Sequence, residues 1–184
     1  MKVVVGAEYN GRTTPAVSTF MSYVIFRPYW NVPEGIAGRE LWPKQRRDES
    51  EFSRNGSEVV RASWGTYVRK KPAPDNALGQ VKLIIPNDYA IYLHDTPSQA
   101  LFKESVRAFS HGCIRVEHPD LLAEFVLGAK GWDLDRVRDA MADGADDQRV
   151  NLDQKLPVYI VYFTAFIRDG MLQFGNDIYA REVH

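Results

Sequence analysis

Three side chains between residues 90 and 116 have the types and spacing of a nucleophile with a base. The lone cysteine, Cys113, follows His94 by 19 positions, and His111 lies two residues before it. A free thiol has a pKa near about 8.5, so an imidazole can raise the thiolate fraction by accepting its proton or by forming an ion pair. Both histidines are candidates, because sequence spacing alone does not choose between them.

The residues that flank Cys113 fit acyl-transfer chemistry. Gly112 predicts a tight turn, whose backbone N–H groups can face the oxyanion of a tetrahedral intermediate. Arg115 shares one face of a predicted strand over residues 113–116 with Cys113, where its guanidinium can hold a substrate carboxylate. An ordinary surface ion pair is the alternative role for Arg115. A single cysteine is more often a small core residue than a nucleophile, so the motif around it has to decide.

Other aromatic and histidine residues carry weaker signals. Tyr92 and Trp30 can line a groove for a peptide, although packing in the core explains both of them about as well. His118 is interpreted as the residue that leads into a helix beginning at Pro119. His184 is interpreted as a solvated residue at the end of the chain.

The composition indicates one globular domain with a balanced charge. The chain has 184 residues, 45% of them apolar, with 23 basic and 24 acidic residues. Such a balance excludes a global field that attracts nucleic acid or an anionic membrane, and favours a small or locally recognised ligand. No apolar run reaches about 18 residues, and the N-terminus lacks the apolar core of a secretory signal. Because a strand is already under way at residues 3–5, we expect the chain to be part of a longer polypeptide.

Strand patterns dominate both ends of the chain and its middle. Residues 2–26 alternate β-rich patches with turn formers such as residues 9–12, which is typical of hairpins. Residues 80–85 and 89–93 predict two strands joined by a turn at residues 86–88, and the second delivers His94 at its end. Residues 157–167 and 171–174 predict two more strands, with a turn at residues 168–170.

Helices are expected mainly after the cysteine. A short helix is predicted over residues 98–103, and a longer one follows His118 and ends at Gly128. A further helix is predicted over residues 134–141, with Asp133 as its N-cap. Residues 34–76 are charged and rich in turn formers, which predicts either a solvated surface or a partly folded insertion; we call them the lid segment.

The segment SHGCIRV at residues 110–116, preceded by His94 and Asp95, resembles the signature of the YkuD-type L,D-transpeptidases. That signature is an upstream His, then a Ser/Thr-His-Gly-Cys core followed by Asn or Arg. Further similarity lies in FRPYWNVP, YLHDTP and the ending LPVYIVYFTAFIRDGMLQFGNDIY, which resemble the larger Gram-negative, periplasmic branch. The resemblance covers nearly the whole chain and places a mobile lid where the lid segment lies.

The resemblance implies a role for each residue of the motif. Cys113 is expected to be the nucleophile and His94 its general base, with the backbone carbonyl of Asp95 orienting the imidazole. His111 is then a supporting residue, and the amides of Gly112 and Cys113 form the oxyanion hole.

The implied reaction is acyl transfer between peptidoglycan tetrapeptide stems. Cys113 attacks the L,D-peptide bond after diaminopimelate and expels D-alanine, and a second diaminopimelate amine resolves the thioester into a 3-3 cross-link. Arg115, Tyr92 and Ser110 are expected to bind the donor stem. Carbapenems are expected to acylate the thiol, and neither a metal nor an organic cofactor is expected. The expected location is the periplasm, with membrane attachment only through a segment upstream of this chain.

The expected fold is a single mainly β domain over residues 1–184, a β-sandwich of mixed sheets with flanking helices. Three alternatives to cross-linking remain. The same thioester can serve hydrolysis, D-amino-acid exchange or lipoprotein attachment. A papain-like peptidase also pairs Cys with His, but there the His follows the Cys. A non-catalytic envelope-binding module is opposed by the joint presence of Cys113, His94 and Gly112.

Overall fold

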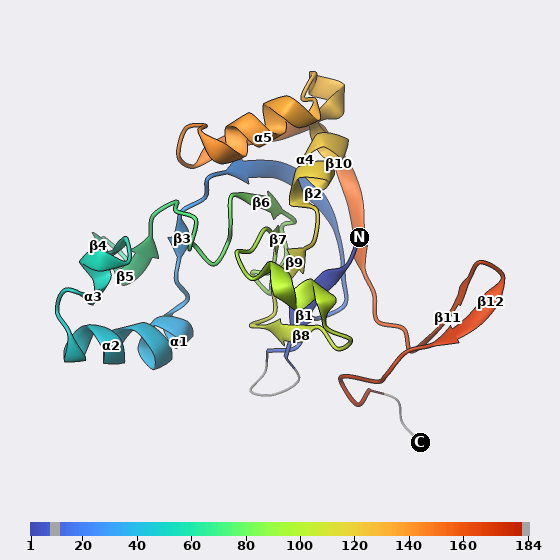
Figure 1. The fold of residues 1–184 in the computed structure, drawn as a ribbon, viewed down its shortest axis with the longest axis horizontal. Helices are drawn as coiled ribbons and strands as arrows, with labels where there is room; N and C mark the ends of the chain where they lie inside the picture. The colour runs from blue at the N-terminus through green and yellow to red at the C-terminus, as the bar shows by residue number, and fades with distance from the viewer. Residues whose placement is uncertain (8–11, 182–184) are drawn as a thin grey trace.

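The centre of the molecule is a mixed sheet, seen in a computed structural model that describes residues 1–7 and 12–181 (Figure 1). Its strands are β1 (Val3–Gly6), β2 (Val17–Phe26), β6 (Val81–Ile84), β7 (Leu93–His94), β8 (Ala108–Ser110), β9 (Ile114–Val116) and β10 (Gln148–Ile160). They lie in the order β10-β2-β6-β7-β9-β1-β8. The β7–β9 and β1–β8 pairs are parallel, whereas the other neighbours are antiparallel. The predicted mainly β fold with mixed sheets is confirmed.

Short helices cover one face of this sheet and enclose the main core. They are α4 (Pro119–Leu127), η3 (Gly128–Lys130) and α5 (Leu134–Ala142), and α4 and α5 lie at the top of the sheet in Figure 1. The short helix η2 (Gln99–Lys103) packs beside β1 instead. The Phe26 ring of β2 stacks on Trp132 with centroids 5.1 Å apart, which ties the helical layer to the sheet. None of the helices in residues 1–7 and 12–181 is long and apolar enough to cross a membrane.

The helix ends follow local chemistry. Pro119 occupies the start of α4, and the Arg136 amide donates to Asp133 Oδ1 over 2.9 Å, which confirms the predicted N-cap of α5. The prediction that α4 ends at Gly128 is confirmed, because the helix runs to Leu127 and Gly128 is its C-cap. A 3-10 turn carries the chain on to Gly131, whose φ of 72° supplies the left-handed conformation that stops a helix.

Two strand predictions are corrected by tertiary pairing. β1 and β2 do not form a hairpin, because β6, β7 and β9 lie between them in the sheet. The predicted turn at residues 9–12 lies mostly outside the described residues. The predicted strand at residues 89–93 is reduced to β7, because the Asn87 side chain bonds the carbonyls of Ile85 and Ile91 and holds a bend there. Ala90 has a φ of 53° within that bend.

The C-terminal strands differ in extent from their prediction. β10 begins at Gln148 rather than residue 157 and pairs with β2, with an irregularity between Asn151 and Leu156. Residues 161–164 then leave the sheet. The hairpin of β11 (Ala165–Arg168) and β12 (Met171–Phe174) turns at Asp169 and Gly170, whose φ values are 52° and 75°, so the predicted turn is confirmed.

The lid segment has a small core of its own beside the main sheet (Figure 1). Its elements are α1 (Glu34–Ile36), the π-helical turn η1 (Ala37–Leu41), α2 (Trp42–Arg47), α3 (Glu51–Arg54), β4 (Ser57–Ala62) and β5 (Gly65–Lys70). β5 also pairs with β3 (Trp30–Asn31). Val32, Phe52 and Val68 are buried together in this core. The segment is therefore more than a solvated surface, while its role as a mobile lid stays a prediction.

We expect Leu127→Ala to lower the free energy of unfolding by about 2–5 kcal/mol, because Leu127 of α4 is fully buried against the sheet. The matched control is Phe125→Ala on the same helix, whose side chain is 71% exposed and should cost less than about 0.5 kcal/mol. Denaturant unfolding measures both. Equal losses in the two variants would show that α4 does not close the core as described.

Candidate active site

Three basic side chains form a row across the middle of the sheet. Lys82 of β6 pairs with His94 of β7, and His94 pairs with Arg115 of β9. Directly opposed residues on neighbouring strands point to the same face. The adjoining pair of Leu93 and Ile114 therefore points to the opposite face, towards the helices. We call Lys82, His94 and Arg115 the basic row.

The basic row opens into a cavity of about 640 Å³ that is lined by strands and by the lid segment. Six of the site residues predicted from the sequence line it: Tyr92, His94, Ser110, His111, Cys113 and Arg115. The remaining two, Asp95 and Gly112, contact residues of this group from outside the lining. The structure thus brings the predicted site together around Cys113.

His94 is a buried, neutral base in this geometry. Its side chain is 4% exposed, and its Nδ1 lies 2.5 Å from the carbonyl oxygen of Asp95. A carbonyl oxygen only accepts, so Nδ1 carries the proton and Nε2 keeps its lone pair. Burial lowers the pKa of His94 to about 3, and the charges of Arg115 and Lys82 act in the same direction. His94 is therefore unprotonated and able to accept a proton at neutral pH.

Cys113 rests as a thiol. Burial raises its pKa, although hydrogen bonds from Tyr92 and the charges of Lys82 and Arg115 oppose that rise. Burial also raises the pKa of Tyr92, and its hydroxyl stays protonated beside the sulfur. A buried neutral imidazole and a protonated thiol favour general-base activation over a resting thiolate–imidazolium pair.

The Cys113 loop is held by the Ser110 hydroxyl. Ser110 Oγ donates to the carbonyl oxygen of Cys113 over 2.6 Å and accepts from the Gly112 amide over 3.1 Å. Gly112 has a φ of 117°, a conformation that other residues rarely adopt, which explains glycine at this turn. Of the two amides expected in an oxyanion hole, that of Gly112 is already engaged with Ser110, so the Cys113 amide is the better candidate. Ser110 positions the loop whether or not it also touches substrate.

The carboxylate of Asp95 anchors the turn that follows β7. Its two oxygens accept from the amides of Gln80 and Thr96 over 2.8 and 2.7 Å. Gly79 lies against this carboxyl group with a φ of 60°, and any Cβ there would collide with it. The backbone carbonyl that orients His94 is fixed by these contacts.

His111 faces the lid segment instead of acting as a second buried base. Its Nε2 lies 3.3 Å from Glu40 Oε1 in η1. Burial and the charge of Arg12 lower its pKa, while Glu40 opposes that shift. The structure therefore separates the two histidines that spacing could not distinguish, and connects His111 to the cavity wall formed by Gly35, Ile36, Arg39 and Glu40.

Sequence reasoning missed Lys82 and the lid residues of the cavity wall. The signal for Lys82 was present, since a lysine within the otherwise apolar strand run VKLII has to face something other than the core. Trp30 lines the cavity and also packs on the core of the lid segment. His118 lies outside the cavity, immediately before α4, as expected.

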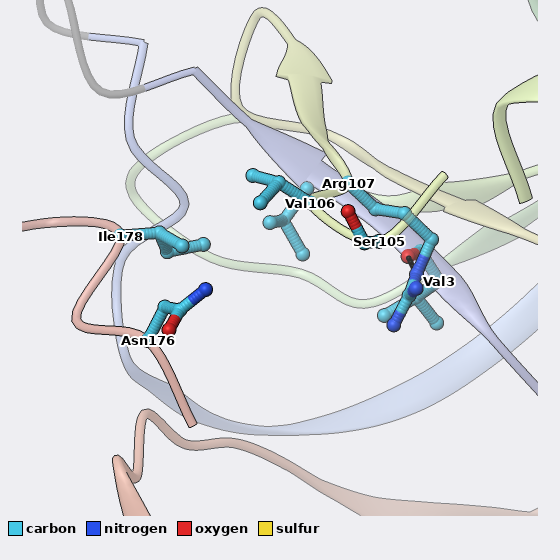
Figure 2. A pocket seen from close by; sticks show the side chains of 7 residues that line it. Val3, Ser105, Val106, Arg107, Asn176 and Ile178 are labelled. Atoms are coloured by element: carbon cyan, nitrogen blue, oxygen red, sulfur yellow. Dashed lines mark hydrogen bonds between the residues drawn. The ribbon is translucent and has the colours of Figure 1, made fainter. Parts of the chain in front are cut away.

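A second, smaller cavity of about 230 Å³ lies beside β1 and β8 (Figure 2). Its only charged lining residue, Arg107, already donates to the carbonyl oxygens of Val3 and Glu104. No Cys, His, Asp or Glu is among its lining residues. In the part of the chain that the structure describes, no cluster of His, Cys, Asp and Glu could hold a metal ion.

Comparisons with known proteins agree on one family. The family model of the L,D-transpeptidase catalytic domain, YkuD, matches residues 1–160. A Haemophilus influenzae protein named "Putative L,D-transpeptidase" is 34% identical over 194 aligned residues, which cover 97% of this chain and 39% of that protein. The chain therefore spans about two fifths of the length of this relative.

We expect the rate of Cys113 alkylation by iodoacetamide to rise with pH through one inflection above about 8.5, the usual thiol value, because burial raises the pKa of Cys113. A pKa of about 3 for His94 predicts no second inflection between about pH 5 and pH 7. Intact-protein mass spectrometry measures the alkylation rate at each pH, from the acidic range through the expected inflection. An inflection below neutral pH would indicate a thiolate–imidazolium pair and contradict the resting state described.

We expect Ser110→Ala to lower the free energy of unfolding by about 1–3 kcal/mol, because it leaves the buried Gly112 amide without its acceptor. Ser18→Ala, at an exposed position of β2, is the matched control and should cost less than about 0.5 kcal/mol. Denaturant unfolding measures both changes. A loss in Ser110→Ala no larger than the control would show that this hydroxyl does not hold the loop.

Proposed function

This chain belongs to the YkuD family of L,D-transpeptidase catalytic domains, and on that premise we propose that it forms 3-3 cross-links in peptidoglycan through a thioester on Cys113. The family acts on peptidoglycan stems. The cysteine-dependent mechanism and the choice of a diaminopimelate acceptor are the proposal for this chain.

One observation carries the proposal: a protonated thiol and a neutral, oriented imidazole share a cavity large enough for part of a peptide. His94 is kept neutral by burial and oriented by Asp95, which are the two properties that a general base requires. The cavity is lined by polar and aromatic side chains from both the sheet and the lid segment, as expected for a peptide groove.

In the first half-reaction, the sulfur of Cys113 forms a bond to the carbonyl carbon of diaminopimelate in the donor stem. His94 Nε2 takes the thiol proton and delivers it to the nitrogen of the departing D-alanine as the C–N bond breaks. The amide of Cys113 stabilises the oxyanion of the tetrahedral intermediate. A thioester and free D-alanine result.

In the second half-reaction, the side-chain amine of a diaminopimelate on an acceptor stem attacks the thioester carbon. His94 accepts the proton that the amine loses and returns it to the sulfur of Cys113 as the C–S bond breaks. The products are a 3-3 cross-link and the free thiol. If water replaces the amine, the same steps give hydrolysis.

Peptidoglycan stems, carbapenems and the cell envelope follow from the proposed reaction as partners and location. Tetrapeptide stems serve as donor and acceptor, and carbapenems imitate the donor because their strained amide acylates the same thiol. We propose the periplasm as the location, where such stems are cross-linked in Gram-negative cells. The chemistry uses only side chains and backbone, without a metal or an organic cofactor.

We expect the chain to gain one carbapenem adduct on Cys113 and to produce 3-3 linked dimers from purified tetrapeptide stems, both measured by mass spectrometry. Cys113→Ala should abolish both products. His94→Gln should slow acylation by about 10²- to 10⁴-fold, because it removes the general base. His118→Gln is the matched control, since that side chain is 54% exposed and lies outside the cavity.

Other outcomes would redirect the proposal. Release of tripeptide without dimers would assign hydrolysis to the site, and incorporation of added D-amino acids would assign exchange. A folded, unmodified chain that forms no adduct and no thioester would contradict acyl transfer and favour a binding module.

A further inference from the structure

Two cations of the basic row, Lys82 and Arg115, form no salt bridge within the described part of the chain. Lys82 and Arg115 flank His94 on the neighbouring strands, and all three side chains line the cavity that contains Cys113. The Arg115 Nε atom is buried without a hydrogen-bond partner in the same part of the chain.

Two cations buried without a salt bridge raise the free energy of the folded protein unless an anion binds to them. Buried cations are normally paired or hydrogen-bonded, because removing them from water is unfavourable. The ammonium group of Lys82 lies 3.9 Å from the centroid of the Tyr92 ring, a cation–π contact that offsets only part of that cost. Burial lowers the pKa of both Lys82 and Arg115, and the charge of Asp147 opposes this shift only in part for Lys82.

An anion that contacts both cations would lie in the cavity, close to the sulfur of Cys113. The charges of Lys82 and Arg115 both act on Cys113, so an anion that contacts them lies near the reacting carbonyl group. Their strands lie on either side of β7, about 10 Å apart at the usual strand spacing of about 4.8 Å. Long side chains from these two positions can converge on one group above His94.

We propose that Lys82 is a substrate-binding residue that forms, together with Arg115, a two-cation cradle for the carboxylate at the end of the donor peptide. The inference rests on the proposed acyl transfer. In that reaction the departing residue directly follows the carbonyl that Cys113 attacks, and it carries a free α-carboxylate. Consecutive Cα atoms are about 3.8 Å apart, so this carboxylate lies close to the reacting carbonyl. The cradle selects donors whose scissile bond precedes a free C-terminal carboxylate, and disfavours longer peptides in which that group is an amide.

The first test measures binding without turnover, using Cys113→Ala and isothermal calorimetry. The probes are a donor tetrapeptide with a free C-terminus and the same peptide as its C-terminal amide. Adding Lys82→Gln should weaken binding of the free acid by about ten- to a hundred-fold and leave the amide almost unchanged. Lys155→Gln on β10 is the control, because it removes the same charge at an exposed position outside the cavity.

The second test measures turnover with Cys113 intact. Lys82→Gln should raise KM for the free acid by about ten- to a hundred-fold, with a smaller change in kcat, and Lys82→Arg should restore most of the loss. The pH profile of Cys113 alkylation should keep its inflection in Lys82→Gln. A shifted inflection with equal losses for acid and amide would overturn the proposal, since Lys82 would then act on the thiolate.

Two further outcomes distinguish a wrong assignment of the carboxylate from a failure of the proposed acyl transfer. If amidating the diaminopimelate side-chain carboxylate removes the effect of Lys82→Gln while C-terminal amidation does not, the cradle binds the other carboxylate and the assignment is overturned. If the unmodified chain forms no thioester but Cys113→Ala still prefers the free acid through Lys82, the acyl-transfer proposal fails and the cradle stands. Thermal unfolding of each variant identifies losses caused by misfolding.

Discussion

The two-residue strand β7 depends on hydrogen bonding to β6 on one side and to β9 on the other, and the site depends on β7. The antiparallel pairing sets Lys82 opposite His94, and the parallel pairing sets His94 opposite Arg115. A shift of either register by one residue would exchange the two faces of the strand. His94 would then point into the helical layer, and Leu93 would enter the cavity. The apolar pair of Leu93 and Ile114 on the opposite face therefore favours the register in which His94 faces the cavity.

The same pairing explains why His94 stays neutral. Its imidazole is buried between two cations, so protonation would add a third positive charge in a poorly solvated place. The Asp95 carbonyl opposes this effect only in part, but it fixes the tautomer. An anion between Lys82 and Arg115 would make protonation of His94 easier at the moment when it takes the thiol proton. Substrate binding and activation of Cys113 would then be electrostatically coupled.

Sequence patterns were sufficient for the parts of the fold that local chemistry determines. The cap at Asp133, the helix start at Pro119 and the C-terminal turn before β12 were all predicted from short-range rules. Strand pairing was not predictable in this way, because β1 and β2 follow each other in the chain but have three other strands between them in the sheet. The bend held by Asn87 was missed for a similar reason, since its amide competes with strand pairing through side-chain bonds.

The candidate site was likewise predictable where residues form a short motif, and unpredictable where strand pairing brings distant residues together. Spacing alone left His94 and His111 as equal candidates, and the motif favoured His94. The burial of His94 and the contact of His111 with Glu40 agree with the motif. Lys82 lies 31 positions before Cys113 and carries no motif, so only the pairing of β6 with β7 brings it to the thiol. A motif identifies residues that are close in sequence or alike across a family. The electrostatic environment of the thiol arises from the order of the strands.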